Sequence, residues 1–228
     1  MAMGSLKMLM MLLLLIESTI FTESSHGSKQ KKADGYGDNV FNVISFGAIG
    51  DGTTDDSKGF KQAWDVACNS SAAASSPTVL VPQGKAFLLQ PLTFNGKSCS
   101  TSNHITFQAL LSFGLIGFVI ADSNNVEMKG IRLEDSPKMH ISFERSSLVH
   151  ANNLTIRAPD SSPNTDGIHI QHSTNVSIHN SIIQTGDDCV SIGNGAKYIN
   201  ITNIKCGPGH GIRVEPNLPC LQKHDSNL

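Results

Sequence analysis

Three aspartates and one histidine stand out in this sequence because their types and spacing suit acid/base chemistry. Asp188 follows Asp166 by 22 residues, His210 follows Asp188 by another 22, and Asp187 is adjacent to Asp188. An Asp-Asp pair most often belongs to a solvated turn. Carboxylates held close together can instead differ in protonation state, so that one donates a proton while the others accept one. Glycoside hydrolysis needs such a set of carboxylates.

The segments that must position these residues contain a repeat. Val126, Val149, Val176 and Ile199 each begin a stretch in which the residues 2, 5 and 7 positions later are apolar or Cys, with Ser181 the one exception. These starts are 23, 27 and 23 residues apart, and shorter apolar pairs lie between them, at 141 and 143, 168 and 170, and 190 and 192. Alternation with a period of two in such short runs favours β-strands over helices.

A period of this length with several short strands per repeat predicts a solenoid. Leucine-rich repeats need an L-x-x-L-x-L frame, whereas this sequence uses Val and Ile between Asn and Gly turns. We therefore predict an all-β fold, a right-handed single-stranded parallel β-helix over about residues 122–212. Equivalent residues of successive coils stack about 4.8 Å apart in such a fold, so Asp166, Asp187, Asp188 and His210 are expected in one groove. A metal site is a weaker interpretation, since no H-x-x-x-H or C-x-x-C spacing accompanies the cluster.

The N-terminus is typical of a secretory signal, with Lys7 followed by the apolar run 8–16. That run is too short to span a bilayer, which needs about 20 residues. A buried N-terminal helix is the alternative. We predict a signal peptide over 1–25, a linker over 26–40 and the β-helix domain over 41–228.

A short helix is predicted to cap the first coil, because four apolar residues lie at helical spacing: Phe60, Ala63, Trp64 and Ala67. The acidic residues before this helix are better suited to turns and helix capping than to catalysis. They are Asp51, Asp55 and Asp56.

Other features fit secretion and narrow the class of partner. Five cysteines leave one over if four pair in an oxidising compartment. Four N-x-S/T sequons predict glycosylation, at Asn69, Asn153, Asn175 and Asn200. The net charge of −2 and the lack of a basic stripe argue against a nucleic-acid partner.

Three motifs carry a specific resemblance: NTDG at 164–167, QTGDDCVSIG at 184–193 and GPGHGI at 207–212. At these motifs the sequence resembles the plant-type polygalacturonases, which are glycoside hydrolases of family 28. Three further segments resemble the same family, namely 41–68, VPQGKAFLL at 81–89 and SPKMHISFE at 136–144. Together the segments cover most of 41–212.

The resemblance implies inverting hydrolysis of α-1,4-galacturonan, a pectin polysaccharide of the cell wall, by a secreted monomer without cofactor or metal. It implies that Asp187 is the general acid and that Asp166 and Asp188 are the bases that activate water. His210 would support the acid and the substrate, with Asn164 and Gly211 as further substrate-binding residues. It also implies the disulfides Cys189–Cys206 and Cys68–Cys99, which leave Cys220 unpaired.

Two departures from the family pattern matter. The family carries a longer stretch where this sequence has the apolar run 109–121, which we expect to be a buried strand pair or foreign sequence from altered splicing. The family also has an Arg-Ile-Lys motif in later coils whose cations bind the substrate carboxylate, and Arg213 and Lys223 do not match it. We therefore expect those cations to be missing and turnover to be far slower than in a full-length relative. The alternative is a truncated, weakly active or non-catalytic galacturonan-binding fragment.

Overall fold

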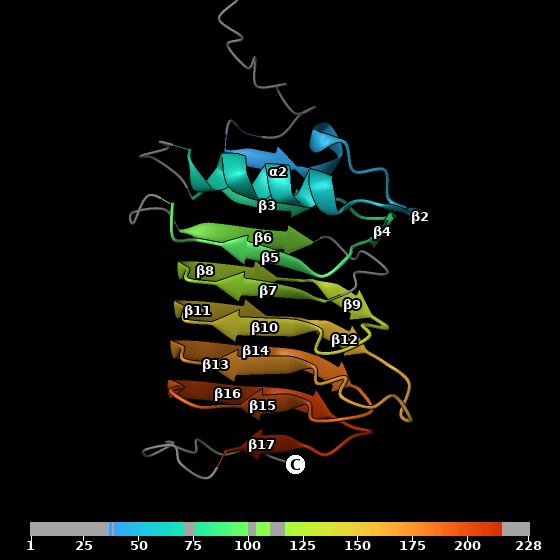
Figure 1. Cartoon of the computed structure of the whole chain (residues 1–228), viewed down its shortest axis with the longest axis vertical. Coiled ribbons are helices and arrows are strands. Elements are labelled where there is room, and N and C mark those ends of the chain that lie inside the picture. Colours follow the sequence, from blue (N-terminus) through green and yellow to red (C-terminus); the bar gives the residue numbers. More distant parts are fainter. Residues whose placement is uncertain (1–36, 38, 71–75, 100–103, 110–116, 216–228) are drawn as a thin grey trace, which may run out of the picture. The chain divides into compact units, whose positions relative to one another are not determined.

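The computed structural model describes residue 37 and residues 39–70, 76–99, 104–109 and 117–215, which lie in one compact unit (Figure 1). The predicted signal peptide, most of the predicted linker, Cys220 and Lys223 lie outside the described residues. Among the helices of the described part, none has the length and apolar character to cross a membrane.

Two parallel sheets, one behind the other in Figure 1, form the solenoid. The first sheet contains β1 (Val40–Asn42), β3 (Thr78–Val81), β6 (Ile105–Ala109), β8 (Asn124–Lys129), β11 (Ser147–Asn152), β14 (Thr174–Gln184) and β16 (Lys197–Cys206). The same sheet includes β9 (Arg132–Glu134) and β12 (Thr155–Arg157). The strand β12 pairs with the second half of β14 on one side and with β9 on the other. Each pairing joins one coil to the next.

The second sheet carries the site described below. It contains β5 (Leu92–Asn95), β7 (Phe118–Ala121), β10 (Ile141–Glu144), β13 (Ile168–Gln171), β15 (Val190–Ile192) and β17 (Ile212–Val214). A separate parallel pair, β2 (Asp51–Asp55) with β4 (Ala86–Leu88), lies near the N-terminal end (Figure 1).

The apolar repeat in the sequence is the coil register of the structure. Val149 pairs with Val126 on one side and with Val176 on the other, and Val176 pairs in turn with Ile199. Apolar side chains of this ladder are buried, and each contributes about 1.5–3 kcal/mol on full burial. The predicted parallel β-helix is therefore confirmed, although parallel pairing begins at β1, well before the predicted start near residue 122.

Ser181, the polar exception in the apolar pattern, is buried without being left unpaired. Its hydroxyl donates to the carbonyl of His179 at 2.8 Å and accepts from the amide of Leu154 at 3.1 Å. A buried hydroxyl with both bonds made escapes the penalty of an unsatisfied polar group. This explains why a serine can occupy an interior position of the coil.

Corners of the coils are made by residues with left-handed backbone conformation. Asn153, Asn180 and Asn203 occupy one corner in three successive coils, with φ of 56°, 50° and 52°. Asn tolerates this region better than most residues. Asn203 Nδ2 donates to Asn180 Oδ1 at 2.7 Å, and Asn180 Nδ2 donates to Asn152 Oδ1 at 3.2 Å, so the same side chains link the coils.

The predicted capping helix is present as α2 (Ser57–Cys68), next to the short 3-10 helix η1 (Val43–Phe46). All four apolar residues that predicted it are buried, and the Trp64 ring stacks on Phe107 with centroids 5.3 Å apart. The helix covers the N-terminal end of the coils (Figure 1). Asp56 occupies the N-cap position, yet its carboxylate accepts from the amides of Ile49 and Gly50 instead of capping the helix.

The apolar run at 109–121 enters both sheets where it is described. Ala109 ends β6, and Phe118–Ala121 forms β7 between β5 and β10. Phe118 and Ile120 are buried in the core, which supports the buried-strand interpretation for this end of the run. Residues 110–116 lie outside the described residues.

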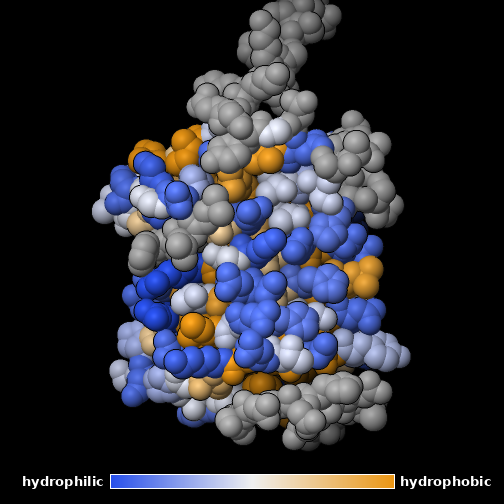
Figure 2. All heavy atoms as spheres, turned by 180° about the vertical axis from the view of Figure 1, so that it is seen from behind, coloured by the Kyte–Doolittle hydropathy of each residue, from blue (hydrophilic) through white to orange (hydrophobic). Residues whose placement is uncertain are grey.

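The view from behind, in Figure 2, shows a mostly hydrophilic surface with small, separate hydrophobic areas. All four sequon asparagines are exposed, namely Asn69, Asn153, Asn175 and Asn200. Glycosylation requires an exposed asparagine, and all four residues meet this requirement. Their glycosylation stays a prediction.

Candidate active site

The predicted site residues meet at the edge of the second sheet where its strands begin. Asp166 lies two residues before β13, Asp188 two before β15 and His210 two before β17. Backbone hydrogen bonds hold these approaches in register: the amide of Gly167 donates to the carbonyl of Asp188 at 2.9 Å, and the amide of His210 donates to that of Asp187 at 3.1 Å. Spacing by one coil therefore brings all four side chains to one edge.

Asp187 is the carboxylate most open to solvent, with its side chain 25% exposed. Its Oδ1 accepts from the amide of Asp188 at 2.9 Å and lies 3.1 Å from Nδ1 of His210. Its Oδ2 accepts from the amide of Asn164 at 3.1 Å. This carboxyl group is thus fixed by the backbone of two coils and has an exposed imidazole as its partner.

Asp166 and Asp188 are far more enclosed, with side chains 9% and 5% exposed. The hydroxyl of Ser191 donates to Asp166 Oδ2. Nε of Arg213 donates to Asp188 Oδ2 at 2.5 Å, and Nη2 of the same arginine lies 4.0 Å from Asp166 Oδ2. Buried charges are tolerated when they are paired and hydrogen-bonded, as both carboxylates are here.

Two glycines let the loops of the site approach one another. A Cβ at Gly209, whose φ is 127°, would lie 2.4 Å from the carbonyl oxygen of Asp187. A Cβ at Gly167 would lie 2.6 Å from the carbonyl oxygen of Cys189. Both positions exclude a side chain, because real Cβ atoms do not come this close to backbone. The GHG and NTDG motifs are thus packing requirements as well as sources of chemistry.

The disulfide between Cys189 and Cys206 joins the loop of the Asp pair to the loop that carries His210, with Cα atoms 5.9 Å apart. A second disulfide joins Cys68 at the end of α2 to Cys99. Both pairings are those that the family resemblance implied. The first directly restrains the site, and the second restrains the N-terminal cap.

The other two residues predicted to bind substrate have different surroundings. Asn164 is exposed, with φ of 56°, and contributes its backbone amide to Asp187. Gly211 accepts from the amide of Cys189 at 2.7 Å and has open space where a Cβ would be. Substrate contact by either residue stays a prediction.

A divalent cation is the other ligand that this cluster could take. Atoms of Asp187, Asp188 and His210 lie within 4.8 Å of one another. Each group already has a protein partner, however, since Asp187 and His210 pair with each other and Asp188 pairs with Arg213. We therefore assign the cluster to acid/base chemistry.

Arg213 is the site residue that the sequence comparison missed. Arg213 does not match the Arg-Ile-Lys motif, and it lies beside Asp188 and Asp166 in the structure; the lack of the family's substrate-binding cations stays a prediction. Arg213 pairs in register with Ser191, which pairs with His169, so the three residues recur at 22-residue intervals. The same spacing that predicted the carboxylates could have placed Arg213 three residues after His210.

His140 supports the site from the interior. It is fully buried, its amide donates to the carbonyl of Asp166 at 2.9 Å, and its Nδ1 lies 3.1 Å from that same oxygen. Its Nε2 lies 3.1 Å from the carbonyl oxygen of Arg157 and 3.3 Å from the amide nitrogen of Ser136. Burial lowers the pKa of His140, an effect opposed by the carbonyls of Asp166 and Arg157.

We expect His140 to make the chain less stable as the pH falls. Its pKa in the folded state lies below the ordinary value of 6.5, so the unfolded chain binds more protons once the pH drops below about 6.5. His140→Asn should cost about 1–3 kcal/mol at pH 7 and should show a smaller further loss between pH 7 and 5 than the wild type. Urea unfolding at both pH values checks this, with His150→Asn at an exposed histidine as the control. An unchanged loss in His140→Asn would contradict it.

Comparison with known proteins supports the same assignment. Residues 115–215 match the model of "Glycosyl hydrolases family 28". The chain is 34% identical to a polygalacturonase of Persea americana over 230 residues, covering 78% of this chain and 48% of that protein. It is 32% identical to polygalacturonase-2 of Solanum lycopersicum over 234 residues, covering 80% and 50%. The chain thus spans about half the length of the curated relatives it matches.

Solved structures share the fold. An endo-xylogalacturonan hydrolase from Aspergillus tubingensis matches with a TM-score of 0.55 and 23% identity, over 77% of this chain and 59% of that one. A family 28 exopolygalacturonase of Yersinia enterocolitica matches with a TM-score of 0.51 and 18% identity, over 77% and 50%. At these identities the likeness supports the solenoid alone. Residues 115–215, which contain the whole carboxylate cluster, are the part of the chain that matches glycosyl hydrolase family 28.

Proposed function

We propose that this chain hydrolyses the glycosidic bonds of α-1,4-galacturonan and so acts in pectin degradation. The observation that carries the proposal is the arrangement at the edge of the second sheet: one accessible carboxyl group paired with a histidine beside two enclosed, charge-paired carboxylates. Full-length relatives that are about one third identical carry the name polygalacturonase. Acid/base hydrolysis needs both kinds of carboxyl group.

In this proposal Asp187 is the general acid. It donates its proton to the glycosidic oxygen as the bond from the anomeric carbon to that oxygen breaks, and the leaving sugar departs with a neutral hydroxyl. Its exposure lets a polysaccharide reach it, and the amides of Asn164 and Asp188 hold it in place. His210, 71% exposed and 3.1 Å from Asp187 Oδ1, supports the acid and lies where it can touch the sugar.

Asp166 and Asp188 act as the bases. One of them accepts a proton from the attacking water while the water oxygen bonds to the anomeric carbon from the face opposite the leaving group, which inverts the configuration. The partners of these carboxylates in the described residues, Ser191 and Arg213, donate to Oδ2 of Asp166 and of Asp188 and so hold the two groups in place.

The same proposal includes secretion to the cell wall and action as a monomer. It rests on the signal-like residues 8–16 and the four sequons, together with the exposure of the sequon asparagines. Two disulfides fit an oxidising compartment. Expression with a fluorescent C-terminal fusion should place the protein outside the plasma membrane, and retention inside the cell would contradict this part.

The alternative is a galacturonan-binding chain with little or no turnover. One observation favours it: the side chains of Asp166 and Asp188 are only 9% and 5% exposed, and Arg213 occupies Oδ2 of Asp188, so little of either carboxylate is open to water. A base held in this way needs its second oxygen to remain available to water.

Reducing-end release from polygalacturonate by the purified chain separates the two functions. We expect steady release from polygalacturonate and none from a neutral β-glucan. Retardation in an affinity gel that contains polygalacturonate, without reducing-end release, would establish binding alone. If the chain shows no reducing-end release and no retardation, both functions are contradicted.

A further inference from the structure

Arg213 forms ion pairs with both enclosed carboxylates, Asp188 and Asp166. It lies in β17, where its Nε donates to Asp188 Oδ2 at 2.5 Å. Its Nη2 lies 4.0 Å from Asp166 Oδ2, and its Nη1 lies 4.0 Å from Glu215 Oε1. The side chain is 51% exposed, so one face of the guanidinium contacts the carboxylates and the other meets solvent.

The environment of Arg213 is otherwise acidic. Asp188 and Asp166 face it from the loops before β15 and β13, Glu215 follows it, and the pair of Asp187 and His210 lies in the adjoining loops. The hydrogen bond with Asp188 raises the pKa of Arg213, an effect that burial opposes, so the guanidinium keeps its charge at every pH at which the protein is folded.

Two enclosed carboxylates without a cation between them would repel each other. The guanidinium of Arg213, which pairs with both, offsets that repulsion. The hydrogen bonds and ion pairs of these two carboxylates within the described residues all use Oδ2. Oδ1 of each group is thereby left to accept a proton from water.

We propose that Arg213 is a positioning residue of the hydrolytic site: it fixes Asp188 through Nε, and its charge offsets the repulsion between Asp166 and Asp188. The inference rests on the proposed function. Arg213 acts on the attacking water only through the carboxylates, so its removal slows the chemical step more than it weakens substrate binding.

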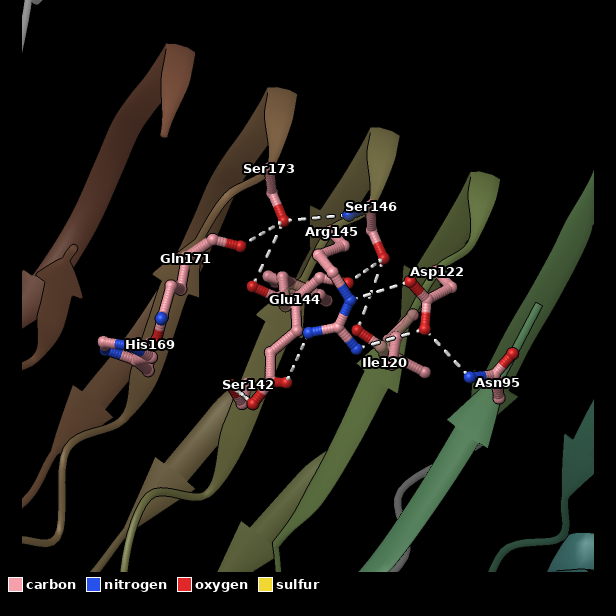
Figure 3. A network of polar contacts seen from close by, with 12 residues as sticks. Asn95, Ile120, Asp122, Ser142, Glu144, Arg145, Ser146, His169, Gln171 and Ser173 are labelled. Carbon is pink, nitrogen blue, oxygen red and sulfur yellow. Dashed lines mark hydrogen bonds and ion pairs between the residues drawn. The ribbon is translucent and has the colours of Figure 1, made fainter. Parts of the chain in front are cut away.

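Arg145 provides a matched control on the same sheet. It follows β10, is 53% exposed, and pairs with Asp122 through Nε at 2.8 Å and Nη2 at 3.1 Å. Figure 3 shows this pair together with Asn95, which donates to the same aspartate. Arg145 therefore resembles Arg213 in exposure and in ion pairing, but its partner is not one of the carboxylates of the site.

The test compares Arg213→Ala, Arg213→Lys and Arg145→Ala on polygalacturonate. We expect Arg213→Ala to lower kcat by about 10–100-fold with KM changed less than about threefold. Arg213→Lys should recover part of the loss, and guanidinium at low millimolar concentration should partly restore Arg213→Ala by filling the vacated position. Arg145→Ala should stay within about twofold of wild type and should not respond to guanidinium.

Several results would overturn the inference. They are an Arg213→Ala variant with wild-type or higher kcat, a variant changed in KM alone, and a loss that neither lysine nor guanidinium relieves. The last would mark a purely structural residue.

Thermal melting tests the ion pairs of Arg213 without requiring turnover. Arg213→Ala should lower Tm at pH 7 by several degrees and by more than Arg145→Ala does, because Arg213 pairs with carboxylates that are 5% and 9% exposed, whereas Asp122 is 28% exposed. Equal Tm losses in the two variants would contradict the inference even in an inactive chain. If the wild-type protein releases no more reducing ends from polygalacturonate than Asp187→Asn does, the proposed function is contradicted instead.

Discussion

Asp187→Asn should lower kcat on polygalacturonate by about 10²–10⁴-fold, which is the usual contribution of a general acid. The amide keeps the shape of the carboxyl group, and its single oxygen can still accept from one of the two backbone amides, that of Asn164 or that of Asp188. It cannot deliver a proton to the leaving oxygen. Initial rates of reducing-end release measure the effect, and KM should change little because the acid acts in the chemical step.

Asp65→Asn is the control for this substitution. Asp65 forms an ion pair with Lys61 on α2, at the N-terminal cap, and contacts none of the site residues in the described structure. Its variant should keep kcat within about twofold of wild type. An Asp187→Asn enzyme with comparable activity would assign the acid to another group.

Removing the disulfide between Cys189 and Cys206 should lower both the stability and the activity of the protein. The double variant Cys189→Ser/Cys206→Ser should lose about 2–4 kcal/mol of unfolding free energy. It should also lose activity while still folded, because the bridge joins the loop of the Asp pair to the loop that carries His210. Denaturant unfolding and kcat at a temperature below both transitions measure the two effects.

Cys68→Ser/Cys99→Ser gives the matched comparison, since it removes a bridge at the N-terminal cap. We expect a similar loss of stability with kcat of the folded fraction nearly unchanged. If both double variants lose kcat to the same extent, the bridge beside Asp188 has no specific role in holding the site.

The parts of the fold that the sequence predicted are those with a strict period. From Val126 to Ile199 each coil repeats the same apolar positions, and the structure pairs them one to one. The N-terminal coils were missed because their spacing is irregular: Val79 pairs with Phe107, whereas Ile105 pairs with Val126, and α2 interrupts the chain before them. A fixed period cannot reveal coils whose corners differ in length.

For the site, the spacing of one coil correctly predicted that the four side chains lie at one edge. Arg213 was not predicted, because it lies outside the family motifs. Arg213 does not match Arg-Ile-Lys, yet the coil register places it opposite Ser191 and beside Asp188. His140 could not be predicted from sequence, because its role depends on a carbonyl of the next coil and on burial. Contacts between residues of different coils can be identified only once the fold is known.

The stereochemistry of the first product tests the central claim most directly. Proton NMR during early hydrolysis of polygalacturonate reports which anomer of the new reducing end forms before mutarotation. Inverting attack by water activated at Asp166 or Asp188, with Asp187 as the acid, predicts that the β-anomer appears first from the α-linked substrate. Asp187→Asn should yield almost none of it. An α-anomer appearing first would show retention and would contradict the assignment of acid and bases.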